Sequence, residues 1–562
     1  MIPGAHQGIV PTKLRGKYVK VAELLVKCLE AEGVDYIFGL PGEENIEVIE
    51  ALRDSSIRFV LARHEQGASF MADVYGRLSG KAGVCLATLG PGAINLTLGA
   101  ADAFLDGAPL VALTGQAASD RIYKESHQCL DLVGLFRPIT KWGQMILLPD
   151  TAPEILRKAF KLAQAERPGA TLVVLPEDVA KQTTGKVPLV PLKPELPSPD
   201  IGKLRQAADI LRRARKPVLL AGNGVCRQRA AQALTSFVEH TGIPVATTFM
   251  AKGVLPEDHP LSLGAVGFMR HDYANFAFDQ ADVILAVGYD LVEYAPKNLN
   301  PNGDKQIVHI HAIPGEVDWA YGLAVELVCD ISRGLAGLMS ALAPECLAKT
   351  LAPRTHELLD KELNSGWDTD SFPLKPQRVV GELRSILRPG DIVLCDTGAL
   401  KMWMARLYRC QKPDTCLFSN GLGTMGYSLP GAIGAKLARP EAKVVAVTGD
   451  GSFLMNSQEL ETAKRLGTPF VVLVWVDNGY GLIKWKQELA FGHNSNVTFA
   501  NPDFVAYAQS FGIAGYQVEK PGDLARFLKL ALDRDELAVI ACPVDYSENT
   551  KLTEKLAGLS GI

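Results

Sequence analysis

The chain lacks the features that attach a protein to a membrane or to nucleic acid. None of its apolar runs approaches the ~20 residues that span a bilayer. Acidic residues slightly outnumber basic ones, 62 against 58, and there is no polybasic stretch, so neither nucleic acid nor a membrane surface is expected as a partner. Residues 1–17 carry scattered basic side chains but no apolar segment. We therefore expect a flexible extension there and no signal peptide.

The cysteines follow no pattern that would bind zinc or build a disulfide framework. Ten of them are scattered along the chain, and none belongs to a CxxC pair. Such spacing is typical of reduced, buried thiols in a cytoplasmic protein.

The sequence has the length and the periodicity of a multidomain α/β protein. With 562 residues it exceeds the size of a single core. Short apolar runs closed by Gly or Pro alternate with helical segments, which is typical of parallel sheets. We predict three doubly wound parallel-sheet domains over residues 17–186, 200–345 and 370–550. The Pro-rich residues 187–199 and the charged residues 347–372 are interpreted as linkers. The expected strands include residues 36–38, 59–62, 83–88, 110–115, 171–176, 217–221, 243–248, 282–288, 306–312, 391–395, 443–449, 470–476 and 538–543.

Two acidic turns follow apolar runs in the last third of the chain. Asp450 lies between Gly449 and Gly451 after VVAVT, and Asp477-Asn478 follow FVVLVWV. Asp477 comes 27 residues after Asp450, about one strand–helix–strand unit, which would place both carboxylates at adjacent strand ends. Magnesium takes few protein carboxylates and completes its shell with phosphate oxygens and water. The spacing therefore favours a metal–diphosphate site, although each motif alone is an ordinary turn.

Two other glycine clusters are weak nucleotide-binding motifs. Residues 421–426 match GxGxxG, but no clean strand precedes them and no acidic residue ends a second strand about 20 positions later. Residues 222–224 follow a good strand and are interpreted as a tight strand–helix turn. A nicotinamide dehydrogenase would rest on the first cluster alone and would require NAD binding.

Glu65 stands at the head of a helical segment after the expected strand 59–62. Alone, it is an ordinary carboxylate favoured by the helix dipole. The next apparent loop, residues 89–95 (LGPGAIN), either cradles a planar ring or forms a simple Gly-Pro turn. His64 and His127 are more often structural than catalytic in such positions.

Together these segments resemble the thiamine diphosphate-dependent enzymes. GDG followed by Asp477-Asn478 is similar to their metal–diphosphate signature, and FGLPGE, RHEQGASFMADVYGRLSGKAGV and LGPGAINL resemble their pyrimidine-binding domain. The resemblance covers about residues 20–545 and implies pyrimidine-binding, middle and diphosphate-binding domains. ESHQCLDLVGLFRPITKW, GYDLVEYAP, SNGLGTMG and WVDNGYG are most similar to acetolactate synthases of the catabolic, flavin-independent type.

The resemblance implies a set of contacts to thiamine diphosphate. Glu65 would hydrogen-bond N1′ of the aminopyrimidine, Met425 would prop the bent cofactor, and Gly423 would offer its carbonyl to the 4′-amino group. The diphosphate would meet backbone N–H groups and a hydroxyl of residues 397–399 and 451–452. The complete predicted cofactor set is Glu65, Thr397, Gly398, Ala399, Gly423, Met425, Asp450, Gly451, Ser452, Asn478 and Tyr480.

The resemblance also implies a magnesium site and a second catalytic residue. The side chains of Asp450 and Asp477 and the carbonyl of Gly479 would bind Mg²⁺. Asp477 replaces the Asn of many relatives, which keeps an oxygen donor in place. Gln128 resembles a polar residue near the reacting carbons, so Glu65 and Gln128 are the predicted catalytic residues. A looser resemblance places Lys141, Lys401 and Trp485 along the substrate pocket.

The implied reaction is a carbon–carbon bond formation on a 2-keto acid. Pyruvate would be decarboxylated, and the hydroxyethyl enamine would condense with a second pyruvate to give 2-acetolactate and CO₂. GYDLVEYAPK stands where flavin-containing synthases carry a GARFDDR-like segment, so FAD is predicted to be absent. The alternatives are a 2-keto acid decarboxylase, a carboligase with another acceptor, and a non-catalytic binding protein, which would have no need of Glu65.

The resemblance finally implies an active site shared between subunits. Glu65 of one chain would face Asp450 of another, which makes a homodimer the smallest active form. A homotetramer of two such dimers is expected.

Overall fold

The computed structural model describes residues 18–192, 195–268, 272–342, 352–365 and 370–549. The chain divides into two compact units, and each is treated by itself. The first contains residues 1–72, 81–104 and 109–193, and the second contains residues 73–80, 105–108 and 194–562. The extension expected at residues 1–17 lies outside the described residues.

The first unit is built on a six-stranded parallel sheet with the order β3-β2-β4-β5-β7-β6. A two-stranded antiparallel pair, β1 and β8, lies apart from this sheet. The strands are β1 Val19–Lys20, β2 Tyr36–Gly39, β3 Arg58–Leu61, β4 Gly83–Ala87, β5 Leu110–Gln116, β6 Trp142–Met145, β7 Ala170–Pro176 and β8 Thr183–Thr184. The α-helices are α1 Val21–Ala31, α2 Ile46–Leu52, α3 Glu65–Ser79, α4 Gly90–Asp106, α5 Leu132–Phe136, α6 Ala152–Gln164 and α7 Glu177–Lys181. Residues 73–79 of α3 and 105–106 of α4 belong to the second unit.

The second unit contains two further six-stranded parallel sheets, and the earlier of them in the chain has the order β11-β10-β9-β12-β13-β14. Its strands are β9 Pro217–Ala221, β10 Val245–Thr248, β11 Ser262–Val266, β12 Val283–Val287, β13 Gln306–His311 and β14 Leu323–Val328. Its α-helices are α8 Ile201–Arg213, α9 Gly224–Arg227, α10 Ala231–Thr241, α11 Tyr273–Gln280, α12 Ile331–Ala341 and α13 Ala352–Asn364.

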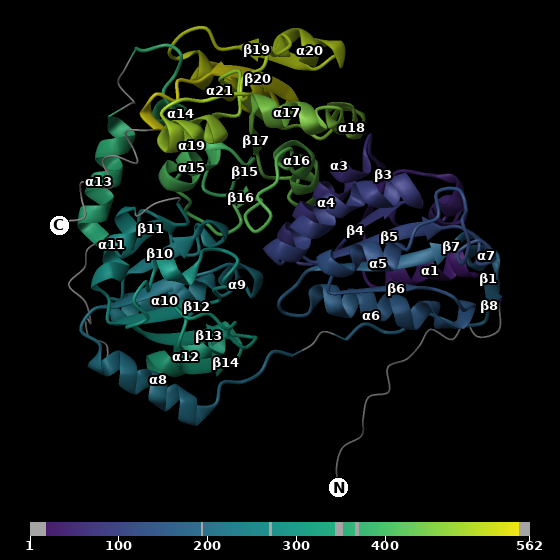
Figure 1. The fold of residues 1–562 in the computed structure, drawn as a ribbon, viewed down its shortest axis with the longest axis horizontal. Helices are drawn as coiled ribbons and strands as arrows, with labels where there is room; N and C mark the ends of the chain where they lie inside the picture. The colour runs from purple at the N-terminus through teal and green to yellow at the C-terminus, as the bar shows by residue number, and fades with distance from the viewer. Residues whose placement is uncertain (1–17, 193–194, 269–271, 343–351, 366–369, 550–562) are drawn as a thin grey trace. The chain divides into compact units, whose positions relative to one another are not determined.

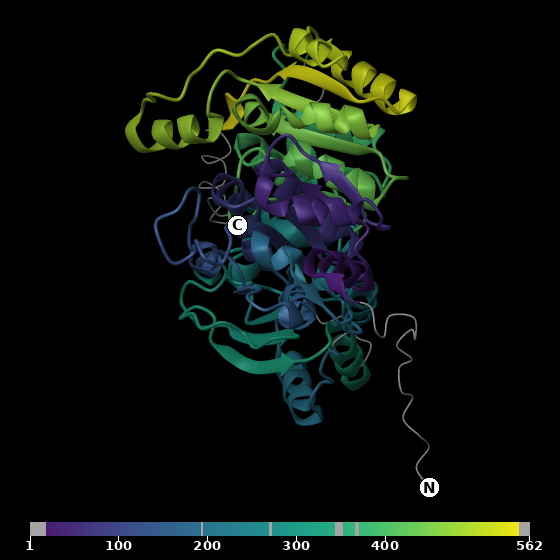
Figure 2. The same ribbon diagram turned by 90° about the vertical axis from the view of Figure 1, so that its right-hand side faces the viewer.

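The last sheet has the order β16-β15-β17-β18-β20-β19 and is also parallel. Its strands are β15 Ile392–Cys395, β16 Cys416–Phe418, β17 Val444–Gly449, β18 Val471–Val476, β19 Ala514–Gln517 and β20 Ala538–Pro543. Its α-helices are α14 Pro376–Ile386, α15 Ala399–Leu407, α16 Ser428–Ala438, α17 Asp450–Asn456, α18 Glu459–Leu466, α19 Gly481–Phe491, α20 Phe504–Ser510 and α21 Asp523–Arg534. Helices flank each sheet (Figure 1, with the same ribbon turned in Figure 2). The predicted fold class of three parallel α/β sheets is confirmed.

Burial on both faces explains why the central strands are continuous apolar runs. In β9, Leu219 and Ala221 pack into the core beneath α10 and α12, whereas Val218 and Leu220 pack into the core beneath α11. Because alternate residues point to opposite faces, a strand covered on both sides must be apolar at every position.

The structure corrects one of the two predicted linkers. Residues 187–192 and 195–199 carry neither helix nor strand, but residues 352–364 form α13. Two charged side chains of α13 are paired, since Asp360 lies 2.8 Å from Arg409 and the buried Glu362 contacts Arg406. Part of the charge that indicated a linker therefore belongs to the packing of a helix. The limits of the three predicted domains stay a prediction.

Nine cysteines in the described ranges are free thiols, and all but Cys129 are buried. Within those same ranges, no helix combines the length and apolarity required to cross a membrane.

Candidate active site

The residues predicted to hold the diphosphate meet at the carboxyl ends of the strands of the last sheet. From β15 the chain proceeds to β16 on one side and to β17 on the other, so the crevice between β15 and β17 is a topological switch point, where parallel sheets bind ligands. A pocket of about 100 Å³ opens there. It is lined by ten predicted site residues, Thr397, Gly398, Ala399, Met425, Asp450, Gly451, Ser452, Asp477, Gly479 and Tyr480, together with apolar residues such as Leu400.

Asp450 organises the turn at the end of β17. It begins α17 and is almost completely buried. Its Oδ1 accepts from the Gly451 N–H at 2.8 Å. Its Oδ2 accepts from the N–H groups of Asp477 at 3.1 Å and Asn478 at 2.7 Å. Burial raises the pKa of this carboxyl, and these hydrogen bonds oppose the rise. The bonds fix the end of β18 against the end of β17, as the spacing predicts.

Asp477 adds a second carboxyl to the same pocket. Burial, and then the charge of Asp450, raise its pKa to about 7, and Lys484 acts in the opposite direction. A carboxyl group whose ionisation is opposed by a neighbouring carboxylate favours a bound cation. The described residues include no cluster of three His, Cys, Asp or Glu side chains suited to a metal. Two carboxylates and a carbonyl instead suit Mg²⁺, which retains water and phosphate ligands.

The backbone after Asp477 forms a rigid turn. Asn478 has a positive φ of 56°, and its carbonyl accepts from the Phe499 N–H at 3.1 Å. The Tyr480 N–H donates to the Val497 carbonyl at 2.8 Å. Asn501, which the sequence does not single out, donates to Asp450 Oδ2 and to Asn478 Oδ1, both at 2.9 Å. Because Asn478 and Tyr480 are both held by these bonds, the turn sets the position of the Gly479 carbonyl.

The pocket has the donors that an anionic group requires. Helices α15, α17 and α19 all begin at its rim, and helix N-termini offer free N–H groups and a partial positive charge. The Thr397 hydroxyl is buried without a hydrogen-bond partner. At Gly451 a side chain would come within 2.9 Å of the Tyr480 ring, so the backbone stays accessible there. These features fit a diphosphate bound beside a magnesium ion.

The GxGxxG segment contributes one residue, Met425, to the lining of the pocket. It lies in the loop of residues 419–427, between β16 and α16, with Gly423 and Gly426 at positive φ of 67° and 76°. A short strand, β16, does precede it, contrary to the sequence-based expectation. Gly423 lies close to Thr397, because a Cβ there would be 3.9 Å from its hydroxyl oxygen.

The first unit contains the two predicted catalytic residues, Glu65, expected to bind the aminopyrimidine ring, and Gln128, expected to lie near the reacting carbons. Glu65 begins α3 and is 9% exposed. Its Oε2 accepts from Asn95 Nδ2 at 3.0 Å, and a Cβ on Gly92 would lie 3.1 Å from its Oε1. Gln128 is exposed, and its backbone packs against Gly90. Glu65 therefore faces the start of α4, and Gln128 lies beside the same helix start.

The loop predicted over residues 89–95 is wrong, because α4 begins at Gly90. Gly90 has a positive φ of 47° at this start, which explains why glycine signals dominate the segment. His64 is structural, since its Nδ1 accepts from the Gln66 N–H at 3.1 Å. His127 is exposed.

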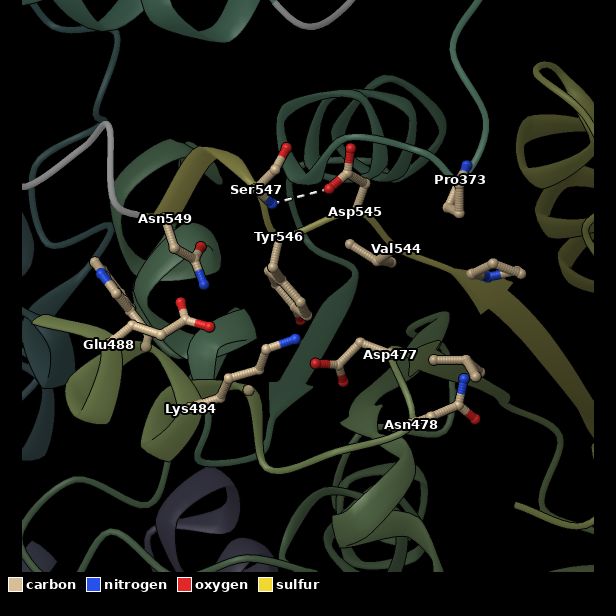
Figure 3. A pocket seen from close by; sticks show the side chains of 14 residues that line it. Pro373, Asp477, Asn478, Lys484, Glu488, Val544, Asp545, Tyr546, Ser547 and Asn549 are labelled. Carbon is tan, nitrogen blue, oxygen red and sulfur yellow. Dashed lines mark hydrogen bonds between the residues drawn. The ribbon is translucent and has the colours of Figure 1, made fainter. Parts of the chain in front are cut away.

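A larger pocket of about 570 Å³ lies on the other side of Asp477. Figure 3 shows Lys484 directed toward Asp477, with Tyr546 above them and Glu488 beside Lys484. Trp485 lines this pocket as well. Asp477, Gly481 and Tyr546 border both pockets, so these three residues lie between the cofactor pocket and the larger one.

Two lysines loosely assigned to the substrate pocket have structural roles. Lys141 Nζ donates to the carbonyls of Ala165 at 2.8 Å and Arg167 at 2.6 Å. Lys401 is buried, and its Nζ donates to the Ser419 carbonyl at 2.8 Å. Both lysines saturate backbone carbonyls, and neither lines either of the two pockets described above.

The second glycine cluster is a tight turn. A Cβ on Gly222 would lie 2.4 Å from Tyr289 Cα, and one on Gly224 would lie 2.7 Å from Gly288 Cα. These glycines let the turn after β9 pack against the turn after β12. Arg227 pairs there with Asp290 at 2.8 Å, and the Asn223 N–H donates to Glu293 at 3.0 Å.

Comparison with known proteins identifies three matching family models. The N-terminal TPP binding domain of thiamine pyrophosphate enzymes matches residues 19–135. The central domain of these enzymes matches residues 204–338. The C-terminal TPP binding domain matches residues 396–542, which include the pocket between β15 and β17.

Curated relatives match over nearly the whole chain. An acetolactate synthase of Bacillus subtilis is 37% identical over 94% of this chain and 94% of its own length. A probable acetolactate synthase large subunit of Methanocaldococcus jannaschii is 38% identical, covering 94% and 93%. A catabolic acetolactate synthase of Raoultella terrigena is 36% identical, covering 95% and 97%.

Proposed function

The chain belongs to the thiamine pyrophosphate enzymes, and we propose that, as a carboligase of this family, it makes 2-acetolactate and CO₂ from two molecules of pyruvate. It is an enzyme of the acetolactate synthase type that forms carbon–carbon bonds. The observation that best supports the proposal is the pocket between β15 and β17, where ten predicted residues meet around Asp450 and Asp477.

The second unit would hold the diphosphate end of the cofactor. Asp450, Asp477 and the Gly479 carbonyl would bind Mg²⁺, which would also take diphosphate oxygens. The Thr397 hydroxyl, unpartnered in its buried position, would donate to the diphosphate, and the helix starts at Ala399 and Asp450 would add N–H groups.

Thiamine diphosphate supplies the electron sink that decarboxylation of a 2-keto acid requires. Glu65 would hold a proton at N1′ of the aminopyrimidine, and Asn95 would fix the orientation of its carboxyl through the 3.0 Å hydrogen bond. Met425 and Leu400, which line the pocket, would exclude water, so that the two-carbon unit passes to an acceptor rather than to a solvent proton.

We propose that the enzyme works without FAD. A dinucleotide would be expected at the switch point between β9 and β12. That position holds the Arg227–Asp290 ion pair and the buried Glu293, whose pKa is raised to about 7 by burial and by Asp290. Paired and buried carboxyl groups at this edge disfavour the phosphates of a dinucleotide.

We propose a homodimer with shared sites, assembled into a homotetramer. Ile94, beside the Glu65 partner Asn95 on α4, is 44% exposed. In the second unit, Tyr480 and Ile483 at the cofactor pocket are 41% and 47% exposed. Exposed apolar side chains at both half-sites suit burial by a second copy of the chain. The free, buried thiols support a cytoplasmic location.

Product analysis tests the proposed reaction. Pyruvate, thiamine diphosphate and Mg²⁺ without FAD should yield 2-acetolactate and CO₂. Acetaldehyde as the main product would instead identify a 2-keto acid decarboxylase, and a product that requires a second keto acid would identify a carboligase with another acceptor.

A further inference from the structure

Asp106 occupies an unfavourable position for a carboxylate. It is the last residue of α4, where the helix dipole is negative. Its side chain is 1% exposed. Burial and the dipole both disfavour a charge here, so the carboxylate depends on specific partners.

The partners of Asp106 are the backbone of the 419–427 loop and one arginine. Asp106 belongs to the second unit, as does this loop. Its carboxylate accepts from the Asn420 N–H at 3.0 Å and from the Gly421 N–H at 2.6 Å. Arg77 Nη1 lies 3.6 Å from Asp106 Oδ2. The two oxygens of the buried Asp106 carboxylate thus hold two consecutive backbone N–H groups.

Arg77 holds both ends of the same loop. It lies in the last turn of α3 and in the second unit. Its Nη1 donates to the Phe418 carbonyl and to the Tyr427 hydroxyl, each at 3.0 Å. Phe418 ends β16, and Tyr427 precedes α16. The Asp106–Arg77 pair therefore fixes the loop at its start, at its second and third residues, and at its end.

Close packing at Gly421 also holds the 419–427 loop in place. A Cβ there would lie 2.9 Å from Leu105 Cβ, 3.0 Å from the Leu105 carbonyl oxygen and 3.1 Å from Asp106 Oδ1. The loop backbone lies directly against the end of α4. Two and four residues later come Gly423 and Met425, and Met425 lines the cofactor pocket.

We propose that Asp106 and Arg77 are positioning residues that place Gly423 and Met425 for thiamine diphosphate. Neither lines the pocket between β15 and β17, so both act through the loop. The inference rests on the proposed function in assigning cofactor contacts to Gly423 and Met425. Residues at the ends of α3 and α4 would thereby set the conformation of the 419–427 loop, which connects β16 to α16.

The variant Asp106→Asn tests this role, with Asp391→Asn as the matched control. Asp391 is also buried, also accepts two backbone N–H groups and also pairs with an arginine, but it precedes β15 at the amino end of the sheet. In the cofactor-free chain, amide hydrogen exchange of residues 419–427 should be on the order of tenfold faster in Asp106→Asn and unchanged in Asp391→Asn. In the loaded enzyme, kcat should fall on the order of tenfold to a hundredfold, as expected for a misplacement of about 1 Å, with a smaller change in KM for pyruvate.

Unchanged loop exchange in Asp106→Asn, or the same kcat loss in Asp391→Asn, would overturn the proposal. If Asp106→Asn does not fold, Arg77→Lys provides the same test, because lysine keeps the charge but its shorter side chain ends before the position of Arg77 Nη1, which donates to Phe418 and Tyr427. Hydrogen exchange without cofactor does not depend on the reaction. A wild-type protein that makes no acetolactate would therefore contradict the proposed function while leaving the role of Asp106 open to measurement.

Discussion

The paired carboxylates of Asp450 and Asp477 determine what the pocket can bind. Asp450 is buried and Asp477 is partly buried, and burial together with the charge of Asp450 raises the pKa of Asp477 to about 7. A divalent cation removes that conflict and brings phosphate oxygens with it.

Removal of the Asp477 charge should change how stability depends on pH. Because the folded-state pKa of Asp477 lies above its unfolded value of 3.8, the native state binds the extra proton, and stability falls as pH rises from about 4 to 7. In Asp477→Asn, thermal unfolding of the cofactor-free protein should show a smaller decline over this range. A residual decline is expected, since the pKa of Glu293 is also raised to about 7. The exposed Asp304→Asn is the control, and an unchanged slope in Asp477→Asn would contradict the account.

Glu65 should matter for the reaction more than for binding. Glu65→Gln keeps the length of the side chain and an oxygen for Asn95 but cannot exchange the proton. We expect thiamine diphosphate to bind with nearly wild-type affinity, while kcat falls about 10²- to 10⁴-fold. Titration of cofactor binding and steady-state kinetics measure the two effects separately. Full activity in Glu65→Gln would remove Glu65 from its assigned role.

At the scale of the elements, burial separates what the sequence predicts from what it does not. The central strands of each sheet are covered on both faces and were predicted as apolar runs. Sequence reasoning missed the short pair β1 and β8 and, in the three large sheets, β6, β11, β14, β16 and β19, which all stand at sheet edges. In β6 and β19 no residue is fully buried, and β16 has only three residues, so their periodicity is weak.

The residues of the candidate site also differ in whether the sequence predicts them. Asp450 and Asp477 were predictable because parallel strands one unit apart end at the same edge of the sheet. Asn501, Tyr546 and Asp106 reach their positions through tertiary packing, and no fixed spacing in the sequence signals them.

The close approach of the 419–427 loop to α4 gives a prediction about packing. Gly421→Ala would place a Cβ within 3.1 Å of backbone and side-chain atoms of Leu105 and Asp106. Such overpacking should lower the free energy of unfolding by about 1–3 kcal/mol. Gly390→Ala is the control, because nothing lies within 4 Å of a Cβ at that exposed turn. Equal unfolding midpoints for the two variants would show that the loop moves freely away from α4.

At the scale of the whole molecule, the proposed shared site predicts rescue between two inactive variants. In a dimer of Glu65→Gln with Asp450→Ala, one site would carry both substitutions and the other neither. Mixing and reassembling the two proteins should therefore restore activity that neither shows alone. If Glu65 and Asp450 serve the same site within one chain, every site stays defective and mixing restores nothing. Light scattering that detects an active monomer would contradict the shared site as well.

The central claim is that this thiamine pyrophosphate enzyme joins two pyruvates without a flavin. The most direct measurement is product identification after incubation of the purified full-length protein with pyruvate, thiamine diphosphate and Mg²⁺, with FAD omitted. The account predicts 2-acetolactate, one CO₂ for each acetolactate formed, and loss of the product when either thiamine diphosphate or Mg²⁺ is withheld. Acetaldehyde in place of acetolactate, or product only after FAD is added, would contradict it.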